Sequence, residues 1–158
     1  MAEPIRLARG LWRASEAVDD VVSRVAALLS IAPPGSVIGG WTAAQLHRLW
    51  LPEPVPTAVE LLLRRDALAP REHAHTTRPE FASRRCGLAP DDIEVLYGLP
   101  VTTAARTWVD LGARLPLADL VAVGDSALRG TTDVHTLERS IGRARRRRGI
   151  VRGWPSPI

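Results

Sequence analysis

The feature that most constrains this sequence is the spacing of its apolar residues, which is helical near both ends of the chain and strand-like in the middle. In residues 15–30, apolar side chains recur every three or four positions, with Ser15 as the expected N-cap, until the Pro-Pro-Gly run at 33–35 ends the pattern. Helical spacing returns in the C-terminal third, most clearly in residues 117–128 and 134–141. Both ends of the chain are therefore predicted to be helical.

The middle of the chain contains short apolar runs bounded by turn-forming residues. Residues 59–63, 72–77 and 93–97 are predicted to be strands, the first of them mostly buried. Thr42 and Gln45 have the spacing of a capping box that would open a brief helix. Because the links between the strands are too short for helical crossovers, we expect them to pair largely antiparallel. The sequence thus predicts an α+β fold, with a small, mostly antiparallel sheet in the middle and N-terminal and C-terminal helices packed on it.

Length and composition favour one folded domain. The chain has 158 residues, of which 46% are hydrophobic, and this is enough to build a core. The one cysteine, Cys86, has no partner for an intramolecular disulfide, which favours a reducing compartment. No apolar run approaches the ~18–20 residues that cross a bilayer, and the N-terminus lacks a secretory signal pattern. We therefore expect a cytoplasmic protein that does not insert into a membrane.

The positive charge of the chain is concentrated at its C-terminus. The net charge is +4, but residues 1–142 carry 15 arginines against all 17 acids, so this part has a net charge of −2. The last sixteen residues contain no acid and six arginines, which are Arg143, Arg145, Arg146, Arg147, Arg148 and Arg152. These six are candidates for weak, non-specific contacts to nucleic-acid phosphates. The alternative is a solvated helix face that leads into a downstream domain.

One segment of the sequence carries a family resemblance. Residues 98–111 read GLPVTTAARTWVDL, and this run resembles the signature of AbiEi-like antitoxin domains. The same signature occurs ahead of the nuclease in actinobacterial proteins related to very-short-patch-repair endonucleases. Residues 33–49, 125–130 and 145–152 resemble further family motifs, in the same order. The chain is accordingly divided into an N-terminal extension at 1–14, interpreted as a remnant of a winged helix, an AbiEi-like α+β domain at 15–142, and an Arg-rich tail at 143–158.

The resemblance implies a function in binding. Such a domain is a non-catalytic, antitoxin-like or regulatory module of a bacterial toxin–antitoxin or defence-type system, and the implied partner is a cognate nucleotidyltransferase-type toxin. In that family, toxin and antitoxin are not generally thought to require a stable complex. Two alternatives stay open. One is a catalytically inactive remnant of a repair-endonuclease-like protein, and the other is an accessory DNA-binding protein that acts through the Arg-rich tail.

The signature places three polar residues on one expected helix. These are Arg106, Thr107 and Asp110, of which Arg106 and Asp110 lie one helical turn apart. They form either a recognition pair that faces a partner or an ion pair that ties the helix to the strand before it, and we favour the second interpretation. Trp108 lies on the apolar stripe of the same helix and is expected in the core.

Few residues favour catalysis or metal binding. Asp91, Asp92 and Glu94 form the densest acidic group, which we interpret as a turn into a strand, with Asp92 and Glu94 on its solvated face, rather than as magnesium ligands. His73 and His75 would share one face of a strand, but no acid or thiol stands at ligand spacing nearby. Neither His47 nor His135 has an evident partner. The sequence therefore predicts no enzyme, no metal and no cofactor.

Overall fold

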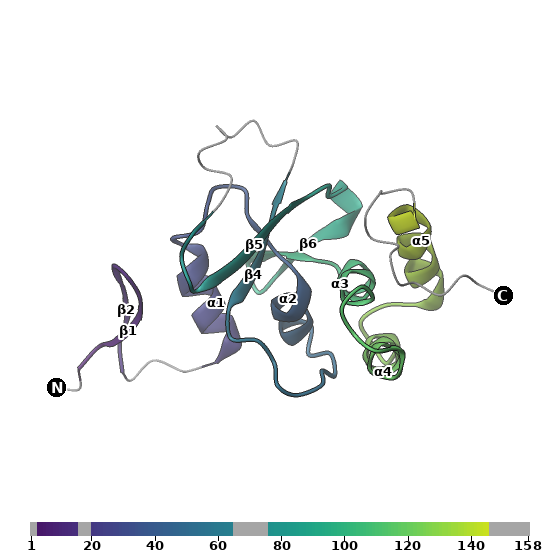
Figure 1. Ribbon diagram of the computed structural model, residues 1–158, viewed down its shortest axis with the longest axis horizontal. Helices are drawn as coiled ribbons and strands as arrows, with labels where there is room; N and C mark the ends of the chain where they lie inside the picture. The colour runs from purple at the N-terminus through teal and green to yellow at the C-terminus, as the bar shows by residue number, and fades with distance from the viewer. Residues whose placement is uncertain (1–2, 16–19, 65–75, 146–158) are drawn as a thin grey trace.

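The structure is a computed structural model that describes residues 3–15, 20–64 and 76–145, and Figure 1 shows their arrangement. Two short strands come first and are followed by a helix, a mixed run of strands and short helices, and three C-terminal helices. In chain order the elements are β1 (Ile5–Ala8), β2 (Leu11–Arg13), α1 (Val21–Leu29), β3 (Val37–Ile38), α2 (Gly40–Leu46), β4 (Val59–Arg64), β5 (Phe81–Cys86), η2 (Pro90–Asp92), β6 (Ile93–Leu96), β7 (Leu99–Thr102), α3 (Ala104–Leu111), α4 (Leu117–Leu128) and α5 (Val134–Arg145).

The strands form two sheets. β1 and β2 make an antiparallel hairpin, and the other strands make a sheet in the order β5-β4-β3-β7-β6. Three of the five strand pairings among the described residues are antiparallel, namely β1 with β2, β3 with β4 and β6 with β7. β3 with β7 and β4 with β5 are parallel. The predicted α+β fold with a mostly antiparallel sheet is confirmed. The parallel pair β4–β5 arises because residues 65–80 give the chain room to return to the same end of the sheet.

The central sheet buries apolar side chains on both of its faces. Ile38 and Leu61 belong to the main core together with residues of α1 and α2, while their chain neighbours Val37 and Leu62 pack in a second cluster with Cys86. Successive side chains of a strand point to opposite faces, so a strand at the centre of such a sheet needs apolar residues without alternation. This is why the run from Val59 to Leu63 was recognisable as a buried strand, and β4 confirms it.

The C-terminal helices build a third apolar cluster beside the sheet. Leu111 of α3 packs there with Leu120, Val123 and Ala127 of α4, and α2 contributes Trp41 and Ala44 on the other side. In Figure 1, α3 lies between the sheet and α5, with α4 below it. No helix among the described residues has the length and apolar character needed to cross a membrane.

Two expectations about helix starts are wrong. The first helix begins at Val21, and its N-cap is Asp20 rather than Ser15, because the Asp20 carboxylate accepts a hydrogen bond from the Ser23 backbone N–H at 2.7 Å. α2 begins at Gly40 without a capping box. The Thr42 hydroxyl instead accepts the backbone N–H of Glu60 at 2.9 Å, so it links the helix to β4.

The strand expected at residues 72–77 lies mostly outside the described residues, and its last two residues, Thr76 and Thr77, are not in a strand. β5 was missed. Its two ends, Phe81 and Cys86, are buried, but the residues between them are small or charged and show no apolar alternation. This composition is tolerated because β5 lies at the end of the strand order and β4 pairs with it along its whole length.

The N-terminal extension forms the β1–β2 hairpin. Gly10 has φ +81° at its turn, in the left-handed region that favours glycine. Ala8 is buried in the main core and anchors the hairpin to the body, while Trp12 is 58% exposed. Figure 1 places the hairpin on the side of α1 that faces away from the C-terminal helices.

Candidate functional site

The signature segment forms the end of β7 and the start of α3. Thr103 is the N-cap of α3, since its hydroxyl accepts the Arg106 backbone N–H at 3.2 Å. The hydroxyls of Thr102 and Thr107 lie 2.7 Å apart, and both residues are fully buried. His47, the C-cap of α2, joins them, with its Nε2 2.8 Å from the Thr102 carbonyl oxygen. Hydrogen bonds therefore fix the strand-to-helix corner on both sides.

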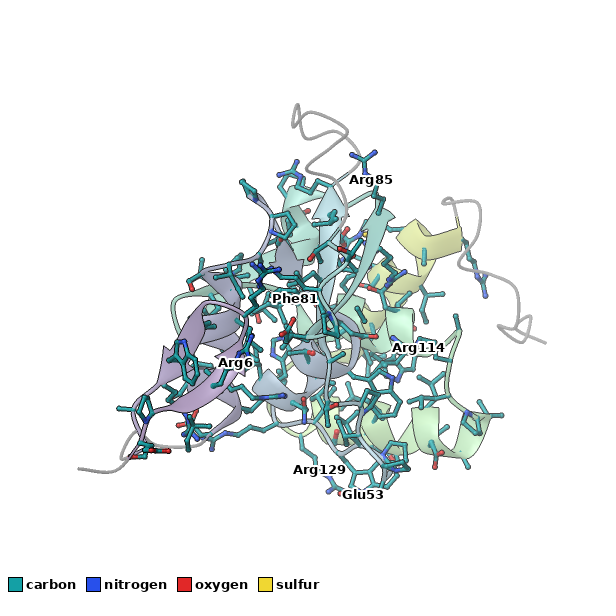
Figure 2. All side chains as sticks on the ribbon, turned by 60° about the vertical axis from the view of Figure 1, so that its left-hand side comes forward. Arg6, Glu53, Phe81, Arg85, Arg114 and Arg129 are labelled. Carbon is teal, nitrogen blue, oxygen red and sulfur yellow. The ribbon has the colours of Figure 1, made fainter. Side chains whose placement is uncertain are left out.

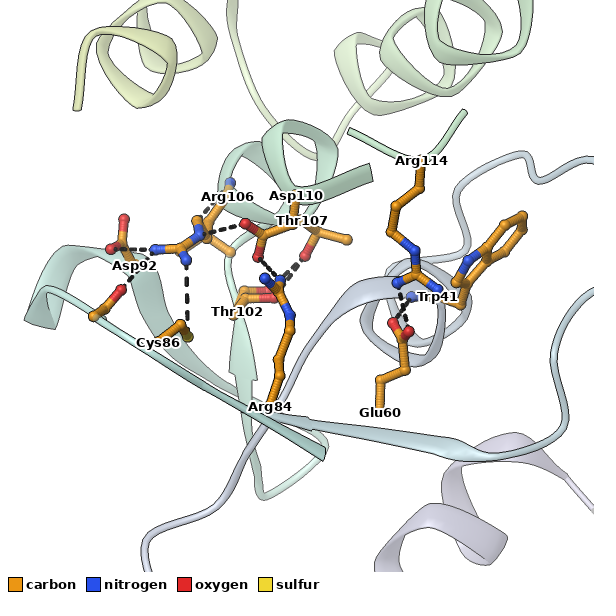
Figure 3. A network of polar contacts seen from close by, with 12 residues as sticks. Trp41, Glu60, Arg84, Cys86, Asp92, Thr102, Arg106, Thr107, Asp110 and Arg114 are labelled. Carbon is orange, nitrogen blue, oxygen red and sulfur yellow. Dashed lines mark hydrogen bonds and ion pairs between the residues drawn. The ribbon is translucent and has the colours of Figure 1, made fainter. Parts of the chain in front are cut away.

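Arg106 lies at the centre of a buried polar network, which Figure 3 shows. Its Nε donates to Asp110 Oδ1 at 3.0 Å, and its Nη1 donates to Asp92 Oδ2 at 2.9 Å. The same Nη1 lies 3.3 Å from the Gly87 carbonyl oxygen, and Nη2 is 4.0 Å from the Cys86 sulfur. One guanidinium therefore joins α3 to the end of β5 and to the turn before β6.

The network is sealed from solvent. The side chains of Arg106, Asp92 and Asp110 are 3%, 2% and 1% exposed. Burial alone would lower the pKa of Arg106, but the carboxylates of Asp110 and Asp92 outweigh it and hold that pKa above its usual value. Burial also raises the pKa of the Cys86 thiol, which keeps it protonated. A charge in such a place is tolerated only because it is paired and hydrogen-bonded.

This geometry corrects the expected exposure of Asp92 and shows where the expected ion pair of Arg106 and Asp110 lies. Asp92 was expected on a solvated strand face, yet it is buried because it belongs to the 3-10 turn η2, where Oδ2 also accepts the Ala89 backbone N–H at 2.9 Å. Glu94 and Asp91 are exposed, as a turn into a strand requires. The pair Arg106–Asp110 is the helix ion pair that the i, i+4 spacing predicted, but it is buried, so its side chains do not face a partner.

Two further arginines reach the network from outside. Arg84 of β5 places Nη2 3.2 Å from Asp110 Oδ2, and its side chain is 47% exposed. Arg143 of α5 places Nη2 3.6 Å from Asp92 Oδ1, and its side chain is 31% exposed. Among the described residues, two carboxylates therefore meet three guanidiniums, and Arg143 ties α5 to the turn η2.

A second polar cluster lies beside the first in Figure 3 and was not found from the sequence. The Glu60 carboxylate accepts the Trp41 backbone N–H at 2.6 Å and pairs with Arg114, whose guanidinium lies 6.0 Å from the centre of the Trp41 ring. Glu60 thus caps the N-terminus of α2 although it belongs to a separate element, the strand β4. Gly40 has φ +54°, and a Cβ there would lie 1.4 Å from Glu60 Oε2, so this approach requires glycine.

The remaining candidates are spread over the molecule. His47 does have partners, because its Nε2 also lies 3.5 Å from the Glu94 carboxylate, and His135 lies 3.8 Å from Glu138. His73 and His75 lie outside the described residues. Within the described part of the chain, no three His, Cys, Asp or Glu side chains are grouped so that they could hold a metal ion.

Of the six arginines in the predicted tail, two lie within the described residues and four lie outside them. Arg143 and Arg145 belong to the last turn of α5, and Arg145 is exposed. Arg143 also lies 3.3 Å from the Ser140 hydroxyl, so its contacts are within the domain. The other four, Arg146, Arg147, Arg148 and Arg152, lie outside the described residues.

Comparison with known proteins places the fold. No protein-family model matches the chain, and no curated protein matches it. A solved structure does: the crystal structure of the RV2827C protein from Mycobacterium tuberculosis has a TM-score of 0.51 and 19% sequence identity, over 88% of this chain and 55% of that one. At this identity the likeness concerns the fold alone. The chain spans about half the length of that structure, and the two share one α+β architecture.

Proposed function

We propose that this chain is a non-catalytic, antitoxin-like binding module of a bacterial toxin–antitoxin or defence-type system, with a nucleotidyltransferase-type toxin as its partner. The observation that carries this proposal is that the charged signature residues are buried and paired within the fold. Arg106 and Asp110 of the signature have side chains that could serve catalysis, but both are buried and paired, with each other and, for Arg106, also with Asp92. Their role is to hold α3 and α5 on the sheet, so that the C-terminal helices keep a fixed outer surface.

That outer surface supports a role in protein binding. Leu117, Val121 and Leu128 of α4 are 63%, 51% and 39% exposed. Spacings of four and seven residues place them along one stripe of the helix, next to the stripe through which Leu120 and Val123 pack in the core. A row of exposed apolar side chains on an ordered helix is typical of a surface that contacts another protein. For this chain we infer a direct contact with the toxin through this row, which the family resemblance does not by itself require.

The test is protection from the toxin. The nucleotidyltransferase-type toxin encoded nearest to this chain is expressed from an inducible promoter, and growth is measured with and without the chain. We expect the chain to restore growth. The variant Val121→Asp places a charge in the α4 row and should reduce the protection. Val95→Asp is the matched control, because Val95 is 76% exposed on β6, and it should protect as the wild type does.

Two results would count against the proposal. If the wild-type chain gives no protection although it accumulates in folded form, the antitoxin-like function is wrong. If Val121→Asp and Val95→Asp protect equally well, the function stands, but α4 is not the surface that serves it.

A further inference from the structure

A groove runs between the β1–β2 hairpin and the segment that leads into β5. Residues 6–10 form one wall and residues 77–80 the other, and the open volume is about 810 Å³. A second hollow of about 290 Å³ continues from it along α1, sharing Arg6, Pro79 and Glu80 and adding Arg24. We call the two together the hairpin groove. Figure 2 shows Arg6 on the hairpin that forms its outer wall.

The hairpin groove gathers positive charge on a body that is otherwise acidic. Among the described residues, four arginines line it, Arg6, Arg9, Arg24 and Arg78, against a single acid, Glu80. Residues 1–142 contain 15 arginines and 17 acids, so removing the groove leaves 11 arginines and 16 acids, a net charge of −5. The groove therefore carries more positive charge than the rest of residues 1–142, and a polyanion would be drawn to it.

Hydrogen bonds hold the arginines of the groove in place. Arg78 Nη1 donates to the Arg9 carbonyl oxygen at 3.1 Å and so joins the two walls, and Arg24 Nη1 donates to the Thr57 carbonyl oxygen at 2.9 Å. A guanidinium has five N–H donors, so each of these bonds leaves others that can reach a phosphate. The half-buried Glu80 carboxylate can balance one of these four positive charges, so the groove keeps an excess of positive charge.

Trp12 lies beside this basic groove, next to Arg6 of its wall, and offers an aromatic surface there. Arg6 and Trp12 are direct partners across the hairpin, so their side chains leave on the same face. Arg6 lines the groove, and its guanidinium lies 5.8 Å from the centre of the Trp12 ring. With 58% of Trp12 exposed, one face of the indole is supported by the cation and the rest is accessible. An unpaired base can stack on such a ring.

We propose that the hairpin groove binds single-stranded nucleic acid, with its arginines on the phosphates and Trp12 stacked on a base. A basic groove that follows a backbone, with an aromatic side chain for stacking, is the arrangement by which proteins bind single strands. A duplex keeps its bases stacked on one another and offers none to Trp12. This site is separate from the antitoxin-like function proposed above and from the Arg-rich tail, where the sequence placed phosphate binding.

The experiment measures fluorescence anisotropy of a labelled 20-nucleotide poly-dT strand and of a labelled 20-base-pair duplex, with the full chain. We expect tighter binding of the single strand. Trp12→Ala should weaken that binding roughly ten-fold. Arg9→Glu should weaken it further and reduce the slope of log K against log salt by about 0.7, the contribution of one phosphate contact on a single strand.

Matched controls separate the groove from general charge and aromatic effects. Trp50→Ala removes another exposed tryptophan, which is 46% exposed, and Arg129→Glu reverses an exposed charge at the end of α4; both should bind as the wild type does. Far-UV circular dichroism verifies that each variant is folded.

Three outcomes would overturn the proposal. The first is tighter binding of the duplex than of the poly-dT strand. The second is unchanged binding of the single strand by folded Trp12→Ala and Arg9→Glu. The third is loss of all binding when Arg146, Arg147 and Arg148 are replaced by glutamine in the full chain, because the tail would then carry the affinity.

Discussion

Arginine is used in two opposite ways in this protein. In the network around α3, Arg106 is 3% exposed and meets two carboxylates. In the hairpin groove, four arginines stand against one acid and line an open hollow. The residue type is the same, but Arg106 has carboxylate partners within the fold on two sides, whereas four arginines of the groove share one acid among the described residues. Neutralised and buried arginine holds elements together, whereas uncompensated and accessible arginine is available to a ligand.

The largest expected difference between the two regions is in stability. Arg106→Leu leaves Asp92 and Asp110 buried without their central partner and should lower the free energy of unfolding by roughly 3–5 kcal/mol. Arg9→Leu, in the exposed groove, should change it by less than about 0.5 kcal/mol. Urea unfolding of both variants measures this contrast. Equal midpoints for the two would show that the network does not stabilise the fold.

Trp108 tests the packing around the network. It was expected as a core residue, but the structure leaves it half-buried at the edge of the cluster formed by α2, α3 and α4, with Nε1 donating to the Leu120 carbonyl oxygen at 2.9 Å. Trp108→Ala should cost about 3 kcal/mol, at the low end for a large aromatic side chain. Trp50→Ala is the exposed control. An unchanged urea midpoint for Trp108→Ala would contradict the placement of α4 against α3.

A smaller effect is expected at Arg84, which lies between the two extremes. Its guanidinium pairs with Asp110 Oδ2, but its side chain is 47% exposed, so solvent screens the pair. Arg84→Ala should lower the free energy of unfolding by about 1 kcal/mol, because Asp110 keeps its bond to Arg106. If the loss matched that of Arg106→Leu, the outer arginine would be as necessary as the central one. In thermal melts, high salt should reduce the difference in melting temperature between the wild type and Arg84→Ala, because salt screens this exposed ion pair.

The smallest effect concerns pH at an exposed cap. Hydrogen bonds from the backbone N–H and hydroxyl of Thr136 lower the pKa of Asp133 from its usual 3.8. The charged form is therefore favoured in the folded state, so the stabilisation is present above pH 3.8 and is lost as the pH falls through the lowered pKa. Wild type should lose slightly more thermal stability than Asp133→Asn across this range. Parallel pH profiles for the two would contradict the cap.

Elements with a complete local pattern were recognisable from the sequence. Residues 117–128 and the start of the last helix at Val134 agree with α4 and α5, because each helix buries one stripe of its own residues. β5 was not recognisable, since its central residues are polar and a strand at the end of the sheet takes its hydrogen bonds from a neighbour. Its parallel pairing with β4 depends on residues far along the chain.

The candidate sites also divide into contacts that a local sequence pattern predicts and contacts that depend on distant residues. Arg106 and Asp110 could be paired from their i, i+4 spacing, a local property of one helix. Asp92 could not be added to them, because it is fourteen positions away and its burial depends on the turn η2 packing against α3. The hairpin groove joins arginines from β1, α1 and the lead-in to β5, which no local pattern connects.

The sequence by itself determined the α+β class, the buried central strand and the C-terminal helices, because the burial of one face imposes a period that can be read locally. Tertiary structure decided which charges are buried and which distant partners they meet. An arginine gains or lacks a distant carboxylate through contacts between separate segments, and its pairing energy depends on the burial those contacts create. The sequence could pair Arg106 with Asp110, but only the fold buries that pair, adds Asp92 to it and leaves Arg9 on the surface.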